Sequence, residues 1–530
     1  MNLTVQCGLL VWLTILLGLP SNGIAGYLSG YPLDSPEAIR EIKSLKLTTD
    51  LGFDLNQVLQ QEDVQEACDR HFGRLDKETD KLPAASLTQV NHIQDMLYCG
   101  KELFFRGSLE SKVGFPSSLI DGILEVFPDE VGPAFTKLGF IADPLSENLP
   151  VGMTQGAGNP WGPLSAVTGS PMTITCAACH FGKTNDGRYS VGMPNQDLDF
   201  GKMMSLIVYV GWIADKDKND PNKWPLEIQE YYRYLDDKVK RHEGGSDFLY
   251  KMSRIVATLR LSNVFYRMVG FSIPTYGELV TYLSGTPNQY YASTPMFPVG
   301  AQHRKGMIMS SPLVYELENF KGQVERGTER PLASFIPTND LENFSRAAFI
   351  FQTGKDEYAK DRYADALSLY LRTLETPKNP VPEDPIMVRK GKKVWDRECQ
   401  ECHNASRGRS LDAYTSEEMG TPKVLINPFV DYEPPHRLAS GIYETYLKHL
   451  GPIAPQPGIY ARTMKGLWTK KNLMVNGSVR DLDHLFCLGT TRGEKGMAVN
   501  EPMSDAVHMD LCDDYSVYEK RVLKAFLKSW

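Results

Sequence analysis

The sequence predicts a mainly α-helical protein with extensive loops, and three observations lead to this prediction. Apolar residues recur at intervals of three and four positions in several stretches, as they do along one face of an amphipathic helix. Strict alternation of apolar and polar residues is scarce, so few strands are expected. The stretch from about residue 145 to 200 is rich in Gly, Pro and Asn, which indicates irregular, loop-built structure.

The composition is that of a folded, mildly acidic protein. The chain has 530 residues, enough for more than one domain and more than one hydrophobic core. Its 42% hydrophobic and 23% charged residues argue against a largely disordered, collagen-like or polytopic membrane protein. Because the formal net charge is −8, we expect no nucleic acid as a partner.

Residues 1–25 have the pattern of a secretory signal peptide. An apolar run from Leu9 to Leu19 is followed by the breaker Pro20 and by small residues suited to cleavage. The run is shorter than the roughly 20 residues that cross a bilayer. We therefore expect a periplasmic or otherwise exported protein with no stable membrane span in the mature chain. Since neither Lys nor Arg precedes Leu9, an uncleaved membrane anchor is the alternative.

Residues 26–144 are expected to form a helical N-terminal module without evident chemistry. The apolar positions of Ala38–Leu45 and of Leu119–Phe127 have helical spacing.

A Pro-rich connector divides the rest of the chain into residues 145–380 and 381–530. In the first part, the irregular stretch is followed by helical patterns, which run from about Pro225 to Met268. The connector, Pro377–Pro382, cannot continue a helix and marks the boundary. The second part ends with helical spacing between Tyr515 and Trp530.

The main chemical signal is a five-residue motif that occurs once in each of these two parts. Both Cys176-Ala177-Ala178-Cys179-His180 and Cys399-Gln400-Glu401-Cys402-His403 read C-x-x-C-H, the signature of covalent c-type haem attachment. Random placement of nine Cys and ten His in 530 positions gives about 0.003 such motifs. The two occurrences are therefore not due to chance.

The spacing of the motif suits haem attachment. Two thiols three positions apart can reach both vinyl-derived carbons on one haem edge when the segment coils, and the adjacent His then faces the iron. We therefore expect two covalent haem c groups, bound through Cys176, Cys179, Cys399 and Cys402, with His180 and His403 as iron ligands. A zinc site is disfavoured because the two Cys pairs are far apart in the sequence. A thioredoxin-like dithiol explains neither the His nor the duplication.

The other cysteines agree with an oxidising compartment. Cys7 should leave with the signal peptide, and the remaining four can pair as Cys68 with Cys99 and Cys487 with Cys512. Buried free thiols are the alternative, since four Cys allow three connectivities. Two further patterns carry no chemistry: Asn185-Asp186-Gly187 indicates a turn, and the charged run Asp215–Asp220 indicates a solvated loop.

The sequence around the motifs resembles known c-type cytochromes. Residues Gly391–Glu398 resemble the helix that leads into the haem motif of small class I cytochrome c domains, which implies that Trp395 packs near the haem edge. Other stretches resemble the periplasmic di-haem c-type cytochrome family that includes rubber oxygenase and, more distantly, bacterial di-haem cytochrome c peroxidase. These stretches are Leu149–Met153, Val191–Pro194, Leu367–Leu374 and Asn476–Leu482. The resemblance covers roughly residues 145–530 and implies two cytochrome c-like haem domains behind the N-terminal module, the first with helical insertions.

The resemblance also implies a distal ligand for the second haem. The family places a His in a turn just ahead of its last helix, and the matching residue is His508. The residues leave other candidates open, which are Met464, Met474, His436, His449 and His484. The choice matters because His/His ligation generally gives a lower potential than His/Met ligation. Where the family has a His before Asn-Gly-Ser, this chain has Val475, so no role of that His is transferred.

The distal side of the first haem is undecided by the sequence. Met193, Met203 and Met204 follow His180, and Met153 precedes it, but Met is common in irregular apolar packing. In rubber oxygenase the corresponding haem binds oxygen at an open position. An open iron in this chain would allow oxygen or peroxide to bind, whereas a closed one would restrict the protein to electron relay.

Two functions follow from these expectations. The first is an exported di-haem c-type cytochrome that carries electrons between redox partners, either a protein or a small electron donor or acceptor. The alternative is a haem oxidoreductase of the peroxidase or oxygenase type, which activates peroxide or oxygen at the first haem. Electron transfer is favoured because no acid–base residue can be placed over the first haem from the sequence, so no catalytic residue is assigned.

Overall fold

The computed structural model describes part of the chain, and every structural statement below concerns that part. The described residues are 51–59, 68, 70, 90–107, 115–146, 148–156, 169–193, 195, 197–198, 203, 222, 226–241, 366–367, 369–371, 374, 377–403, 413–414, 459–460, 464, 466–470, 473, 479, 481–489 and 510–530. The expected signal peptide, the pattern Ala38–Leu45 and the second half of the pattern Pro225–Met268 lie outside the described residues.

Helix α6 (Val90–Arg106) forms the first core together with the segment around residues 366–374. Leu97, Leu103 and Phe104 of α6 are buried in this core. The two segments approach closely at Gly100, where an added Cβ would lie 2.1 Å from the carbonyl oxygen of Ala366. Glycine at this position therefore allows the close backbone packing.

Helix α7 (Ser117–Val126) confirms the helix predicted over Leu119–Phe127. It is followed by α8 (Pro128–Val131) and the 3-10 helix η3 (Pro133–Leu138), and it packs against α12 (Leu226–Arg241). The packing is tight at Gly122, where an added Cβ would lie 2.6 Å from the ring of the fully buried Tyr231.

Two small antiparallel sheets lie beside these helices. One has the order β1 (Leu51–Gly52), β6 (Tyr189–Val191), β5 (Phe181–Lys183), and α4 (Leu55–Leu59) follows its first strand. The other has the order β2 (Phe115–Pro116), β4 (Pro171–Ile174), β3 (Met153–Gln155). These strands have two to four residues, too few for alternation to show in the sequence. The region expected to be irregular therefore contains short strands as well as loops.

The C-terminal part has a second core built around two long helices, α20 (Pro385–Glu398) and α27 (Val517–Ser529). Helix α20 begins at the N-cap Asp384, whose carboxylate accepts a hydrogen bond from the N–H of Ile386, and α27 begins with a capping box of Ser516 and Glu519. The helices confirm the helical patterns predicted at Gly391–Glu398 and Tyr515–Trp530. They touch at Gly391, where an added Cβ would lie 1.9 Å from the carbonyl oxygen of Val522.

Shorter elements complete the described C-terminal part. They are α21 (Gln400–His403), β7 (Ala413–Tyr414), β8 (Ile459–Tyr460), the 3-10 helix η9 (Leu467–Thr469), α25 (Leu482–Leu485) and α26 (Asp510–Asp513).

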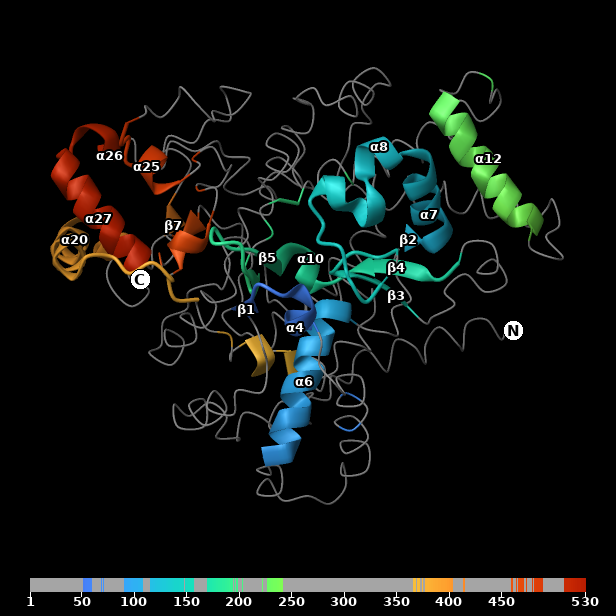
Figure 1. Ribbon diagram of the computed structural model, residues 1–530, viewed down its shortest axis with the longest axis horizontal. Helices are drawn as coiled ribbons and strands as arrows, with labels where there is room; N and C mark the ends of the chain where they lie inside the picture. The colour runs from blue at the N-terminus through green and yellow to red at the C-terminus, as the bar shows by residue number, and fades with distance from the viewer. Residues whose placement is uncertain are drawn as a thin grey trace, which may run out of the picture.

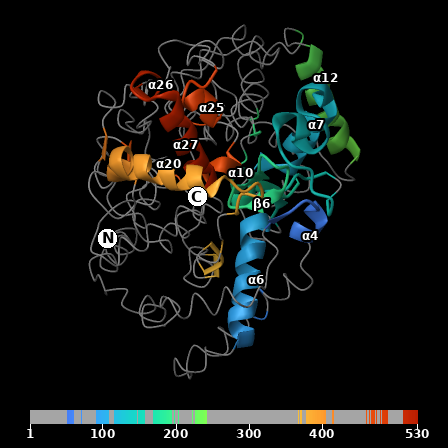
Figure 2. The same cartoon turned by 60° about the vertical axis from the view of Figure 1, so that its left-hand side comes forward.

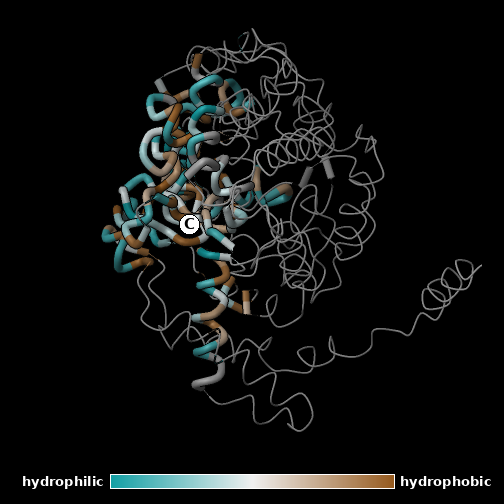
Figure 3. Tube along the Cα trace, turned by 90° about the vertical axis from the view of Figure 1, so that its right-hand side faces the viewer, coloured by the Kyte–Doolittle hydropathy of each residue, from teal (hydrophilic) through white to brown (hydrophobic). Residues whose placement is uncertain are grey.

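Figures 1 and 2 show how the described elements are arranged. Helices α20, α25, α26 and α27 gather on one side, α7, α8 and α12 gather on the other, and the sheets with the short helix α10 (Cys176–His180) lie between them. Hydrophilic and hydrophobic residues are interspersed along the described part of the chain (Figure 3), as expected for elements that have one buried and one exposed face. No helix of the described part is long and apolar enough to span a membrane.

Candidate functional site

The first C-x-x-C-H motif forms the short helix α10 between β4 and β5. Positions separated by three and four residues lie on the same face of a helix, so this turn places positions 176, 179 and 180 on one side. Thr175 fixes the start of the turn, because its N–H donates to the Gly152 carbonyl (2.8 Å) and its buried hydroxyl donates to the Phe105 carbonyl (2.8 Å). The motif is thereby attached to α6 and to the loop before β3.

Two stretches on either side of this motif in the sequence contact it. In Leu149–Met153, Gly152 has a φ of +85°, and an added Cβ would lie 2.0 Å from the backbone nitrogen of Ala178. In Val191–Pro194, the N–H of Gly192 donates to the His180 carbonyl (2.8 Å). The turn is therefore enclosed by backbone on both sides.

The imidazole of His180 lies in the protein interior. Its Nδ1 atom is buried and has no hydrogen-bond partner among the described residues. Burial lowers the pKa of His180 to about 4, so the ring is neutral at neutral pH. A neutral imidazole is the form that binds a metal, and a buried ring nitrogen without a partner fits a site in which a further group supplies that partner.

The second motif continues directly from α20. Cys399 ends that helix. The N–H groups of Cys402 (3.2 Å) and His403 (3.0 Å) donate to the Cys399 carbonyl, and these hydrogen bonds coil the motif into α21. As in the first motif, the two Cys positions and the His position share one face of a turn. The ring of Trp395 lies 6.0 Å from the ring of His403, between centroids.

The described motif cysteines are thiols, as thioether attachment requires. Cys176, Cys399 and Cys402 lie outside any disulfide and are partly buried, whereas the side chain of Cys179 is not described. Burial, helped by the nearby Glu398 carboxylate, raises the pKa of Cys399 to about 12. Each motif could therefore hold one haem through its two Cys positions and one His.

The structure places some of the candidate distal ligands near the motifs. Met193 is fully buried in the first core, against which Cys176 packs, and Met464 packs on the second core together with Cys399. Met153 and Met203 are also buried, and so is His484 on α25. The candidates Met204, Met474, His436, His449 and His508 lie outside the described residues, as does Val475.

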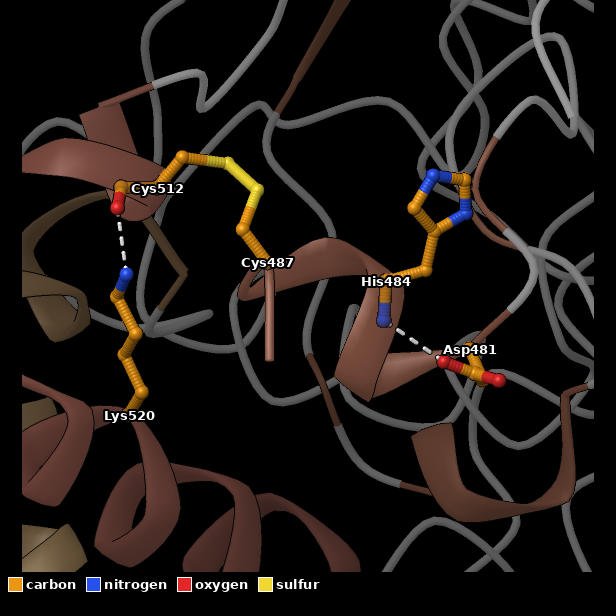
Figure 4. The surroundings of a disulfide bond; sticks show 5 residues. All are labelled: Asp481, His484, Cys487, Cys512 and Lys520. Atoms are coloured by element: carbon orange, nitrogen blue, oxygen red, sulfur yellow. Dashed lines mark hydrogen bonds between the residues drawn. A yellow bond between two sulfur atoms is a disulfide. The ribbon is translucent and has the colours of Figure 1, made fainter. Parts of the chain in front are cut away.

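Both of the cystine pairings considered from the sequence are present. Cys68 joins Cys99 on α6, and Cys487 joins Cys512 on α26. Figure 4 shows the disulfide between Cys487 and Cys512 to one side of the imidazole of His484, which α25 carries. The buried Lys520 donates to the Cys512 carbonyl (2.5 Å), so α27 is tied to the second disulfide.

A cavity of about 180 Å³ lies beside the first motif and was not predicted from the sequence. Phe105 and Gly152, which both bind Thr175 through their carbonyls, are among its lining residues. Glu102 also lines it, 3.7 Å from the Arg106 guanidinium. Burial raises the pKa of Glu102 against the opposing effect of Arg106, and Asp143 raises it further.

Contacts between the two motif regions were not predicted either. The side-chain amide of Asn185, in the turn after β5, donates to the carbonyls of Trp468 (2.7 Å) and Lys470 (3.0 Å) at η9. The triplet Asn185-Asp186-Gly187 does form the predicted turn, but no local pattern indicates a partner so far along the chain.

Comparisons of the chain with family models, with curated proteins and with solved structures gave no match. The function is therefore argued from the residues and their geometry.

Proposed function

We propose that the chain is an exported di-haem c-type cytochrome that carries electrons between redox partners. The observation that carries the proposal is the repeated C-x-x-C-H motif, coiled in both places into one helical turn. A haem bound at each turn would supply a one-electron redox centre. The two disulfides support an oxidising compartment.

The residues of the chain hold and orient this chemistry. The cysteines of each motif would hold one haem covalently, and His180 and His403 would each bind its iron. Burial keeps His180 neutral and ready to donate its lone pair. Packing of Trp395 against Phe526 and Trp530 gives His403 a rigid aromatic neighbour. His508 is proposed as the distal ligand of the second iron.

Covalent attachment is tested by extracting the purified protein with acidified acetone and by measuring its intact mass. We expect the pigment to stay with the protein and the mass to exceed that of the chain by two haems. Replacing Cys176 and Cys179 by Ala should remove one haem, and replacing Cys399 and Cys402 should remove the other. The matched control replaces Cys68 and Cys99, which should leave both. Colour that leaves entirely with the solvent would overturn the proposal.

A second candidate function is a haem oxidoreductase that activates peroxide or oxygen at the first haem, and it is favoured by the cavity whose lining includes Phe105 and Gly152, the hydrogen-bond partners of Thr175. A polar cavity can stabilise charge that develops on a bound oxygen species, and Glu102 lines this one. Electron paramagnetic resonance of the oxidised protein separates the two functions. Two low-spin signals are expected for the electron carrier, and a high-spin signal that shifts on addition of cyanide would establish the oxidoreductase instead. Replacing His508 by Ala should convert the second iron to high spin.

A further inference from the structure

The turn between β5 and β6 links the first motif to the second core. This turn, Thr184–Arg188, follows the first motif after the three residues of β5, and we call it the docking turn. Its Asn185 amide binds two backbone carbonyls of the C-terminal part, those of Trp468 and Lys470. A side-chain amide has two donor hydrogens, so this pair of contacts uses its full donor capacity.

The docking turn is held in shape by its own hydrogen bonds. The carboxylate of Asp186 accepts from the Arg188 guanidinium (2.6 Å) and from the Thr184 hydroxyl. Although partial burial opposes the effect, these hydrogen bonds lower the pKa of Asp186 and keep it ionised. Gly187 supplies the left-handed conformation that the turn needs, with a φ of +87°. Asn185 is therefore presented on a preformed turn, which lowers the entropy lost on docking.

The surface that accepts the Asn185 hydrogen bonds, formed by Trp468 and Lys470 at η9, is here called the receiving surface. It too is held in place by contacts of its own. The indole N–H of Trp468 donates to the Pro377 carbonyl (3.0 Å) in the connector between the two parts. The guanidinium of Arg188 lies 5.8 Å from the centre of the Trp468 ring and donates to the Lys378 carbonyl (3.4 Å). The docking turn thus contacts both η9 and the connector.

The receiving surface is continuous with the second motif. Leu467, next to Trp468, is buried in the core that contains Trp395, and Cys399 packs on the same core. Covalent bonds and hydrogen bonds therefore lead from the first motif as far as η9, and side-chain packing in the second core joins η9 to Cys399. The bonded part of this route runs from His180 along β5 to Asn185, and across the amide contacts to η9.

We propose that Asn185 is a positioning residue that docks the first haem domain on the second and carries the electronic connection between the two sites. The docking stands on the hydrogen bonds alone, whereas the electronic role rests on the proposed function. In the transfer, one electron leaves the reduced site and reduces the other, and no bond forms or breaks. The docking turn keeps the separation of the sites constant while this occurs.

The test compares Asn185→Ala with Asn379→Ala in the full-length protein. Asn379 is a control because its amide also donates to a distant backbone carbonyl, that of Lys528 (2.9 Å), but it joins the connector to α27 and does not touch the docking turn or η9. Backbone hydrogen exchange reports docking without any need for haem. We expect the η9 amides of Thr469 and Lys470 to exchange about tenfold faster in Asn185→Ala, and to be unchanged in Asn379→Ala.

The electronic role is measured by flash reduction of one site and by following the electron to the other. We expect Asn185→Ala, and also Asn185→Asp, which loses the amide donors, to slow this transfer at least tenfold at unchanged haem content and unchanged spectra. Unaltered hydrogen exchange of the η9 amides in both Asn185→Ala and Asn185→Asp would overturn the docking. Faster exchange with an unaltered transfer rate would overturn the electronic connection. A protein without covalent haem would refute the proposed function instead, while the exchange measurement would still decide the docking.

Discussion

Replacing Gly152 by Ala tests whether the loop before β3 shapes the first motif. Gly152 has a φ of +85°, a conformation that costs an L-residue about 1–2 kcal/mol. The new Cβ would also lie 2.0 Å from the nitrogen and 2.3 Å from the Cα of Ala178, so the backbone of α10 must move. Overpacking of this kind costs about 1–3 kcal/mol. The total loss of unfolding free energy is therefore roughly 2–5 kcal/mol.

Gly489 provides the matched control for this prediction. Its φ is +80°, but nothing lies within 4 Å of an added Cβ, so Gly489→Ala should lose only the conformational part, about 1–2 kcal/mol. Urea denaturation of both variants measures the difference. Under the proposed function, a displaced α10 would misalign the two Cys positions and His180, so the intact mass of Gly152→Ala should show one haem instead of two. Equal losses of stability in both variants, with two haems retained in Gly152→Ala, would refute the reasoning.

Three further predictions concern the second core, its disulfide and the cavity. Gly391→Ala should lower the unfolding free energy by about 1–3 kcal/mol in urea denaturation, because the new Cβ would lie 1.9 Å from the Val522 carbonyl oxygen. Replacing Cys487 and Cys512 by Ser should lower it by about 3.5 kcal/mol, the loop entropy for a separation of 25 residues, and a reductant, which also opens Cys68–Cys99, should cause a larger loss in the unmodified protein. Glu102→Gln tests pH dependence. Burial holds the pKa of the Glu102 carboxyl above its ordinary value, so folding favours the neutral form of this group. The unfolding free energy should therefore fall as the pH rises from below the ordinary pKa through the raised one. Denaturation at several pH values should show a smaller fall in Glu102→Gln, and parallel curves for the two proteins would contradict the assignment.

The long helices could be predicted because local signals specify them. In α27, apolar spacing coincides with the capping pair Ser516 and Glu519, and in α20 the N-cap Asp384 precedes Pro385. The two local cystine pairings were one of the arrangements that the sequence left open, and the structure contains them. The short strands gave no signal because two to four residues do not establish a period.

Only those parts of the candidate site whose residues are adjacent in the sequence could be predicted from it. The residues of each C-x-x-C-H motif are adjacent, so their spacing alone indicates the helical turn that the structure contains. The hydrogen-bond partners of Asn185 could not be predicted in this way. Trp468 lies in a distant part of the sequence, and it contributes a backbone carbonyl, which every residue carries. Glu102 likewise becomes distinctive only through the loop that buries it.

The burial of Cys399 has a consequence for how the protein matures. Thiol–disulfide exchange requires a thiolate, and a thiol with a pKa of about 12 is almost wholly protonated at neutral pH. Once the second core has formed, the Cys399 thiol is therefore a slow nucleophile toward a disulfide such as Cys487–Cys512. The same folding step that encloses this sulfur thus slows its exchange with the two cystines.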